Sequence, residues 1–230
     1  MKQYIRALSA VGVFALILTQ LSVAEAGWPF DRDDKIEGSG NVIEQKLDLA
    51  DFDSIELRGV TDLDITVGEA FSAMLEVEDN LAEYVLIDVR RGRLIIELED
   101  DIELDTDEGI ILHLSMPELV EMEIKGVSQV NATGIDSDEL SIEFSGVGGM
   151  ELSGKAERLD VALTGVGQLD LRDLEAVDVE VAHSGVGKIH VYASERLDAA
   201  MSGIGKIRYS GDPDDVDRAE SGLGRIVAAR

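Results

Sequence analysis

Four carboxylate residues recur at intervals of 18 to 20 positions in the C-terminal half of the sequence. If each interval is one coil of a repeating structure, these residues form one column, and stacked carboxylates ~4.8 Å apart repel one another. A divalent cation such as Ca²⁺ prefers oxygen ligands and would relieve that repulsion. The column predicts either a Ca²⁺ site, whose occupation would raise the melting temperature, or a solvated acidic edge. We call it the acidic ladder, and its members are Asp160, Glu180, Asp198 and Asp217.

Cationic residues gather at a second set of repeated positions. Ile189, Ile207 and Ile226 occupy equivalent places in successive repeats, and in a strand the neighbours of an inward side chain face outward. These neighbours should form an exposed strip, which is either a docking face or a soluble surface that acids such as Asp170 neutralise. An acidic glycan, a lipopolysaccharide phosphate or the acidic edge of a second copy would suit a docking face. We call it the basic strip, and it consists of Lys188, His190, Lys206, Arg208 and Arg225.

Residues suited to catalysis are sparse. The chain has no cysteine, and of its three histidines His183 falls at an apolar position of the repeat, so neither a nucleophile–base pair nor a zinc site is indicated. Paired carboxylates can cleave sugars, but the only tryptophan that could stack on a sugar, Trp28, lies outside the repeats. We expect no enzymatic activity and no cofactor, with a polysaccharide-active β-helix enzyme as a weaker alternative.

Six copies of a short motif would position both columns. A Ser or Thr, a glycine, an apolar residue and a second glycine recur, with a degenerate first copy at Lys125-Gly126-Val127-Ser128, and the first glycines are 18 to 20 residues apart. Between copies, apolar and polar residues alternate and the apolar ones align from copy to copy, which is typical of stacked strands. The pattern predicts an all-β fold in which residues 119–230 form a parallel β-solenoid of about six coils of 18–20 residues.

The paired glycines should form the corners of these coils. Glycine adopts positive φ without steric cost, and the preceding Ser or Thr can hydrogen-bond the local backbone. A β-branched residue resists positive φ, so Gly165→Val or Gly185→Val should unfold the chain or block its secretion. The corner glycines are Gly146, Gly148, Gly165, Gly167, Gly185, Gly187, Gly203, Gly205, Gly222 and Gly224.

Residues 1–26 have the features of a secretory signal peptide. Lys2 and Arg6 precede an apolar run, and Ala24-Glu25-Ala26 is a small-x-small cleavage site. The run is shorter than a membrane-spanning helix needs, so we expect no transmembrane anchor. Cleavage leaves 18 basic and 47 acidic residues and a formal charge of −29, which excludes nucleic acid as a general partner. The expected location is the periplasm, the exterior or the cell surface.

The rest of the chain is expected to form one folded unit, residues 41–230. Residues 27–40 should be a loose lead-in, and residues 41–118 a less regular β region ahead of the solenoid. In that region Arg58-Gly59-Val60-Thr61 resembles an early corner, and Arg91-Gly92 is typical of a hairpin turn.

Several motifs resemble one bacterial family, described as putative auto-transporter adhesin, head GIN domain. They are Phe52-Asp53-Ser54-Ile55, Asp79-Asn80-Leu81, Met116-Pro117-Glu118-Leu119, the repeated corners, and Tyr209-Ser210-Gly211-Asp212-Pro213. The resemblance implies an exported, right-handed β-helix-like domain, and it implies no catalytic residues in this chain. The predicted function is a non-catalytic envelope or secreted module for binding or adhesion, with an unidentified envelope component or glycan as partner and self-association as a further expectation. The alternative is a structural periplasmic protein whose acidic surface binds divalent cations.

Overall fold

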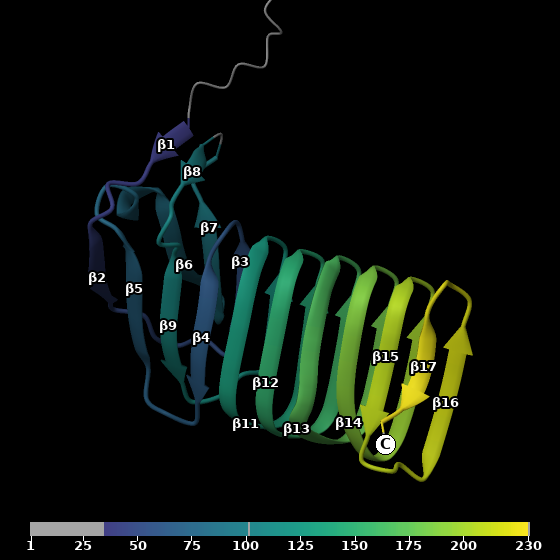
Figure 1. Cartoon of the computed structure of the whole chain (residues 1–230). Coiled ribbons are helices and arrows are strands. Elements are labelled where there is room, and N and C mark those ends of the chain that lie inside the picture. The colour runs from purple at the N-terminus through teal and green to yellow at the C-terminus, as the bar shows by residue number, and fades with distance from the viewer. Residues whose placement is uncertain (1–34, 101, 230) are drawn as a thin grey trace, which may run out of the picture. The chain divides into compact units, whose positions relative to one another are not determined.

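The computed structural model describes residues 35–100 and 102–229. These residues form strands, short turns and one 3₁₀ helix, η1 (Ala82–Tyr84), which confirms the all-β expectation (Figure 1). The expected signal peptide, residues 1–26, and most of the lead-in lie outside the described residues. The end of the lead-in forms β1 (Lys35–Glu37), which pairs in parallel with β8 (Glu103–Asp105).

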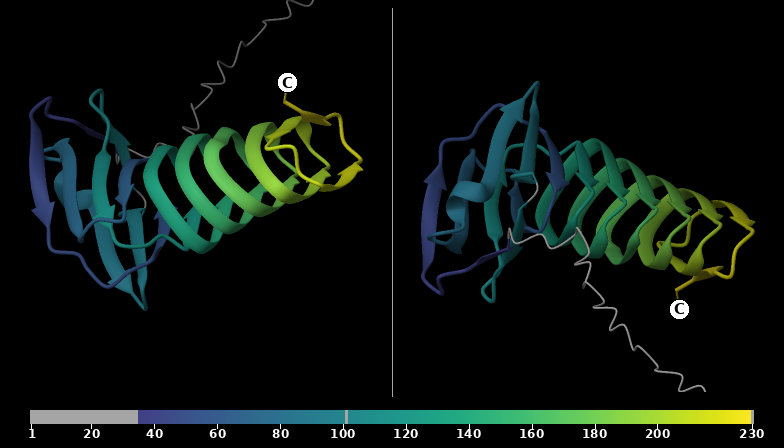
Figure 2. Two further views of the ribbon diagram at one scale, coloured as in Figure 1. Left: turned by 90° about the horizontal axis from the view of Figure 1, so that it is seen from below. Right: turned by 90° about the horizontal axis from the view of Figure 1, so that it is seen from above.

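The C-terminal half is the predicted parallel β-solenoid (Figure 2). Each long strand bends once and pairs with the next over both of its halves. Six corners therefore delimit about five turns. At the bends the pairing register shifts, and glycines with positive φ, such as Gly134 and Gly154, lie beside these shifts. The solenoid strands are β11 (Val127–Phe144), β12 (Val147–Leu163), β13 (Val166–His183), β14 (Val186–Met201), β15 (Ile204–Ser210), β16 (Asp215–Glu220) and β17 (Arg225–Ala228).

The bends divide the solenoid into two faces with a core between them. Residues 127–132 and their register partners in β12–β15 and β17 form what we call the A face. Residues 139–144 and their partners in β12–β14 and β16 form the B face. Inward side chains alternate with outward ones on both faces, so every coil contributes aliphatic side chains to a continuous core. Burial of this core, and not a disulfide, stabilises the fold because the chain has no cysteine.

The N-terminal region extends the same two faces. Strand β3 pairs with β10 on the B face and β4 pairs with β11 on the A face, so the turn between β3 and β4 is a genuine corner, in which Val60 bridges Val127. Strands β7 and β9 pair in parallel beyond β3 and β4, and antiparallel β5, β6 and β2 end the stack. The strands are β2 (Val42–Leu47), β3 (Ser54–Arg58), β4 (Asp62–Val67), β5 (Ser72–Glu78), β6 (Val85–Arg90), β7 (Arg93–Leu98), β9 (Ile111–Met116) and β10 (Glu121–Ile124).

The corner glycines act differently from the expectation. Among the ten predicted corner glycines, positive φ occurs at three second glycines, Gly148, Gly187 and Gly205, and at none of the first glycines. The first glycine is required because the coils approach closely: a Cβ at Gly165 would overlap the carbonyl oxygen of Gly146, and one at Gly185 that of Gly165. Backbone hydrogen bonds continue from coil to coil through these corners, for example from Val186 N to Gly165 O at 2.9 Å. Steric overlap between backbones, rather than φ, therefore excludes side chains there.

The C-terminal coil replaces core residues with charged ones. Arg218 and Glu220 are the register partners of Ala199 and Met201, which are buried in the preceding coil. The Arg218 guanidinium lies 5.2 Å from the centre of the Tyr209 ring, and Glu220 Oε1 accepts a hydrogen bond from the Ile226 backbone N–H at 2.6 Å. These side chains give the solenoid the polar end that stacked repeats need to remain soluble.

Candidate anion-binding site

The basic strip lies on the A face as its alternation predicts. Lys188, Lys206 and Arg225 are consecutive register partners, and His190 pairs with Arg208 in the neighbouring column. Isoleucines between them are buried in each coil. The strip is therefore two adjacent columns of outward side chains on successive coils, which lie ~4.8 Å apart.

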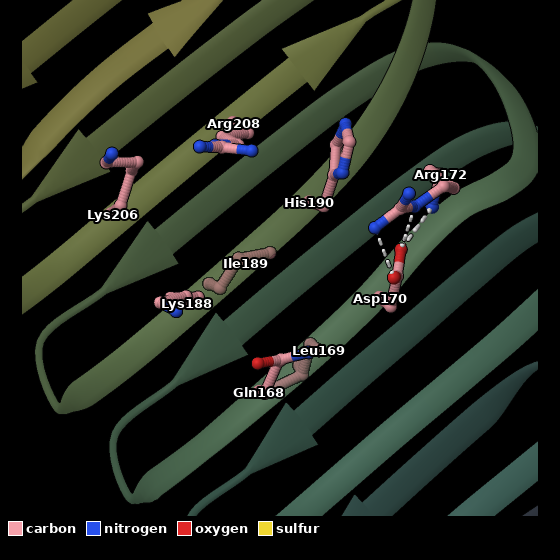
Figure 3. Close-up of a pocket in the computed structure, with 9 residues that line it drawn as sticks. All are labelled: Gln168, Leu169, Asp170, Arg172, Lys188, Ile189, His190, Lys206 and Arg208. Atoms are coloured by element: carbon pink, nitrogen blue, oxygen red, sulfur yellow. Dashed lines mark hydrogen bonds and ion pairs between the residues drawn. The ribbon is translucent and has the colours of Figure 1, made fainter. Parts of the chain in front are cut away.

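Most of the strip lines one surface pocket of about 250 Å³. Figure 3 shows side chains from three successive coils around it. Gln168, Asp170 and Arg172 on β13 form one side, and the other side comes from β14 and β15. Arg225 lies one coil beyond the pocket. The pocket thus brings together Arg172 and four members of the strip, Lys188, His190, Lys206 and Arg208.

Asp170, an acid that could neutralise the strip, forms its ion pair with Arg172 on the same strand. Arg172 donates two hydrogen bonds to Asp170, from Nε at 2.7 Å and from Nη2 at 2.6 Å, which lowers the pKa of the Asp170 carboxyl (Figure 3). Among the described residues, no carboxylate lies within 4.0 Å of the charged groups of Lys188, Lys206, Arg208 or Arg225. The strip retains its positive charge on a strongly acidic molecule.

His190 is a half-buried member of the strip. Its Nε2 is buried and has no hydrogen-bond partner. Burial lowers the pKa of His190, and the nearby Arg172 and Arg208 lower it further. A neutral His190 at neutral pH can therefore offer the pocket a ring nitrogen for a hydrogen bond.

The acidic ladder forms on the B face. Asp160 pairs in register with Glu180, Glu180 with Asp198, and Asp198 with Asp217. The neighbouring column alternates in sign through Arg158, Asp178, Arg196 and Asp215. In the part of the chain that the structure describes, no three carboxylates or histidines converge on a position that could hold a metal ion. The ladder is linear and lacks the enclosed oxygen cage of a tight Ca²⁺ site.

Sequence reasoning missed an ion-pair network at the N-terminal end of the B face. Glu56, whose side chain is only 6% exposed, contacts Lys125 Nζ at 2.9 Å, Arg58 Nη2 at 2.6 Å and Arg93 Nη1 at 3.4 Å. Arg93 also binds Glu121, at 2.6 Å. These residues come from β3, β7 and β10 and the turn that follows β10, so only the order of strands in space brings them together.

The histidines do not form a common site. His183 is 1% exposed in the core, and neither ring nitrogen has a hydrogen-bond partner. His113 lies on the A face of the N-terminal region, 3.5 Å from an Asp64 oxygen and 3.4 Å from a Glu76 oxygen.

None of the helices in the described ranges is long and apolar enough to cross a membrane.

The chain is thus a parallel β-solenoid with regular outward columns of side chains. Residues 51–213 match the family described as putative auto-transporter adhesin, head GIN domain, and the chain belongs to that family. This confirms the resemblance and supports the coarse description of a binding module that is exported or on the cell surface.

One solved structure in particular agrees with this assignment. A putative adhesin from Bacteroides fragilis superposes with a TM-score of 0.71 at 25% identity, and the match covers 84% of this chain and 100% of that one. A putative lipid binding protein from Parabacteroides distasonis has a TM-score of 0.49 at 21% identity over 85% of this chain and 100% of that one. A search of curated proteins found no match.

Proposed function

We propose that the protein is a non-catalytic, exported binding module that attaches to an anionic component of the cell envelope through the basic strip. The observation that carries the proposal is the stacking of four cations without acidic partners, Lys188, Lys206, Arg208 and Arg225, on a chain with a formal charge of −28.

Stacked like charges destabilise a sheet, and the chain has carboxylates in abundance with which it could have paired them. An anionic ligand bound across the strip would offset this repulsion and gain charge-assisted hydrogen bonds from lysine and arginine. The repeated spacing suits a ligand with several anionic groups, such as the phosphates or carboxylates of an envelope glycan. Charge complementarity would raise the rate and specificity of the encounter, and its effect would decrease with salt.

The proposal is tested by changing Lys188, Lys206 and Arg225 together to Gln and measuring sedimentation with isolated envelope at low and high salt. We expect the variant to lose most of the low-salt binding of the wild type. The matched control removes three outward cations from other parts of the coil, Lys155, Arg158 and Arg196, and should bind as the wild type does. Equal binding by both triple variants, with unchanged circular dichroism, would contradict the proposal.

A second candidate function, cation binding by the acidic ladder, is favoured by the in-register stacking of its four carboxylates. A bound divalent cation stabilises the folded state according to its concentration and affinity. Ca²⁺ should then raise the melting temperature by more than NaCl of equal ionic strength does. The variant Glu180→Gln, Asp198→Gln should abolish this difference.

A further inference from the structure

The apolar residue of each corner is exposed, and together these residues form a ridge along one edge of the molecule. Exposure ranges from 45% at Val186 to 84% at Leu223. Each member from Val60 to Ile204 is bridged or paired with the next in register, and Leu223 repeats the backbone hydrogen bond of the earlier corners. The apolar ridge consists of Val60, Val127, Val147, Val166, Val186, Ile204 and Leu223.

Uncharged residues surround the ridge in its central part. The three segments 162–167, 182–187 and 200–205 contain no Asp, Glu, Lys or Arg. Alanines precede the corners on the B face, and Ala182 and Ala200 are exposed. Three successive corners therefore make a charge-free edge about 10 Å long on a chain in which 30% of residues are charged, and burying this edge would desolvate no ion.

We propose that the apolar ridge is a self-association surface on which a second copy of this chain packs side by side and parallel. A second copy has the same rise of ~4.8 Å per coil, so each ridge side chain meets an identical one, as in the dry interfaces of paired sheets. This surface uses different side chains from the basic strip, and the inference is independent of the proposed function.

The charged columns farther out on the two faces, beyond the uncharged residues next to the ridge, favour the parallel orientation. The basic strip lies on the A face and the acidic ladder on the B face. When two copies pack parallel about a two-fold axis along the solenoid, the A face of one copy continues into the B face of the other. Antiparallel packing would instead place like faces side by side, and like charges disfavour that arrangement.

The size of the ridge predicts weak association. The seven corners, ~4.8 Å apart, make an edge about 30 Å long, and two sheets about 10 Å apart make it about 10 Å wide. Each copy would bury roughly 300 Å², which is below the roughly 800 Å² per partner of stable interfaces. The contact should therefore form at high local concentration, as among copies held on one surface.

Analytical ultracentrifugation over a range of concentrations tests this inference. The wild type should self-associate, also at high salt, whereas Val166→Lys, Val186→Lys should remain monomeric and still bind envelope. The matched control, Thr133→Lys, Ser194→Lys, adds the same charge at exposed positions away from the ridge and should associate as the wild type does. A monomeric wild type at every concentration, or equal association by the ridge variant, would overturn the inference.

Single-cysteine variants test the orientation because the chain has no cysteine. Val127 and Leu223 lie five corners apart, and a short bis-maleimide cannot span about 24 Å. Parallel packing predicts that Val127→Cys and Leu223→Cys each crosslink with themselves. Crosslinking only in a mixture of the two variants would show antiparallel packing and overturn the proposed orientation. Ridge-dependent binding to phosphatidylcholine vesicles by a monomeric protein would identify a lipid surface as the occupant instead.

Discussion

Replacing Glu56 with glutamine should destabilise the protein strongly at neutral pH and less in acid. The Glu56 carboxylate is nearly buried, and cations from three parts of the chain surround it. Burial by itself raises the pKa of a carboxyl group, but the hydrogen bonds from Lys125 and Arg58 and the charges of these residues outweigh it. The net effect lowers the pKa of Glu56 from 4.5 to about 2.

The size of this shift sets the expected change in stability. One pKa unit corresponds to about 1.4 kcal/mol, so ionised Glu56 contributes about 3 kcal/mol to the free energy of unfolding. Because the pKa is lowered in the folded state, this contribution is complete above pH 4.5 and is lost as the pH falls from 4.5 towards 2. At pH 3 about 1 kcal/mol of it should remain.

Urea unfolding followed by circular dichroism measures both quantities. The difference between wild type and Glu56→Gln should be about 3 kcal/mol at pH 7 and should decrease steadily below pH 4.5. The control Glu157→Gln changes an exposed carboxylate and should alter stability by less than about 0.5 kcal/mol. A difference for Glu56→Gln that is small at pH 7, or that stays constant down to pH 3, would refute the electrostatic reasoning.

Three further perturbations test the core, the corners and the surface charge. Gly185→Ala should cost about 3 kcal/mol or more in urea unfolding because its Cβ would overlap a backbone carbonyl oxygen, whereas Gly149→Ala, which meets only the flexible Gln129 side chain, should change little. His183→Leu should stabilise the protein by about 1–3 kcal/mol, since it removes two unpaired ring nitrogens from an apolar column; a loss of stability would show that the histidine has a partner in solution. NaCl should raise the melting temperature by screening the acidic surface, and a decrease would refute this view of the surface charge.

Much of the solenoid could be predicted from the sequence because one coil repeats in one register. Once the corner motif is aligned, period-two alternation indicates which strand positions face outward, and the residues of the basic strip and of the acidic ladder are register partners in successive coils. The N-terminal region could not be ordered in this way. Strands β7 and β9 follow β3 and β4 in the chain but stack outside them, and no repeated motif marks that order.

Other differences arise from contacts that a linear pattern does not encode. Arg172 and Asp170 are two positions apart on one strand, so their pairing could have been inferred from parity. The role of the first corner glycine depends on how closely the backbones of two neighbouring coils approach. The exposure of the apolar ridge depends on the direction in which a side chain points at a sharp corner, which alternation along a strand does not give. The charged residues Arg218 and Glu220 interrupt apolar columns, and this interruption marks the end of the solenoid.

Amide chemical-shift mapping during titration with a short polyphosphate measures whether the basic strip binds anions. If it does, we expect saturable shifts confined to the A face around Lys188, His190, Lys206 and Arg208, which disappear in the variant with Gln at positions 188, 206 and 225. Shifts spread evenly over the surface, shifts centred on another region, or none at millimolar polyphosphate would contradict this binding.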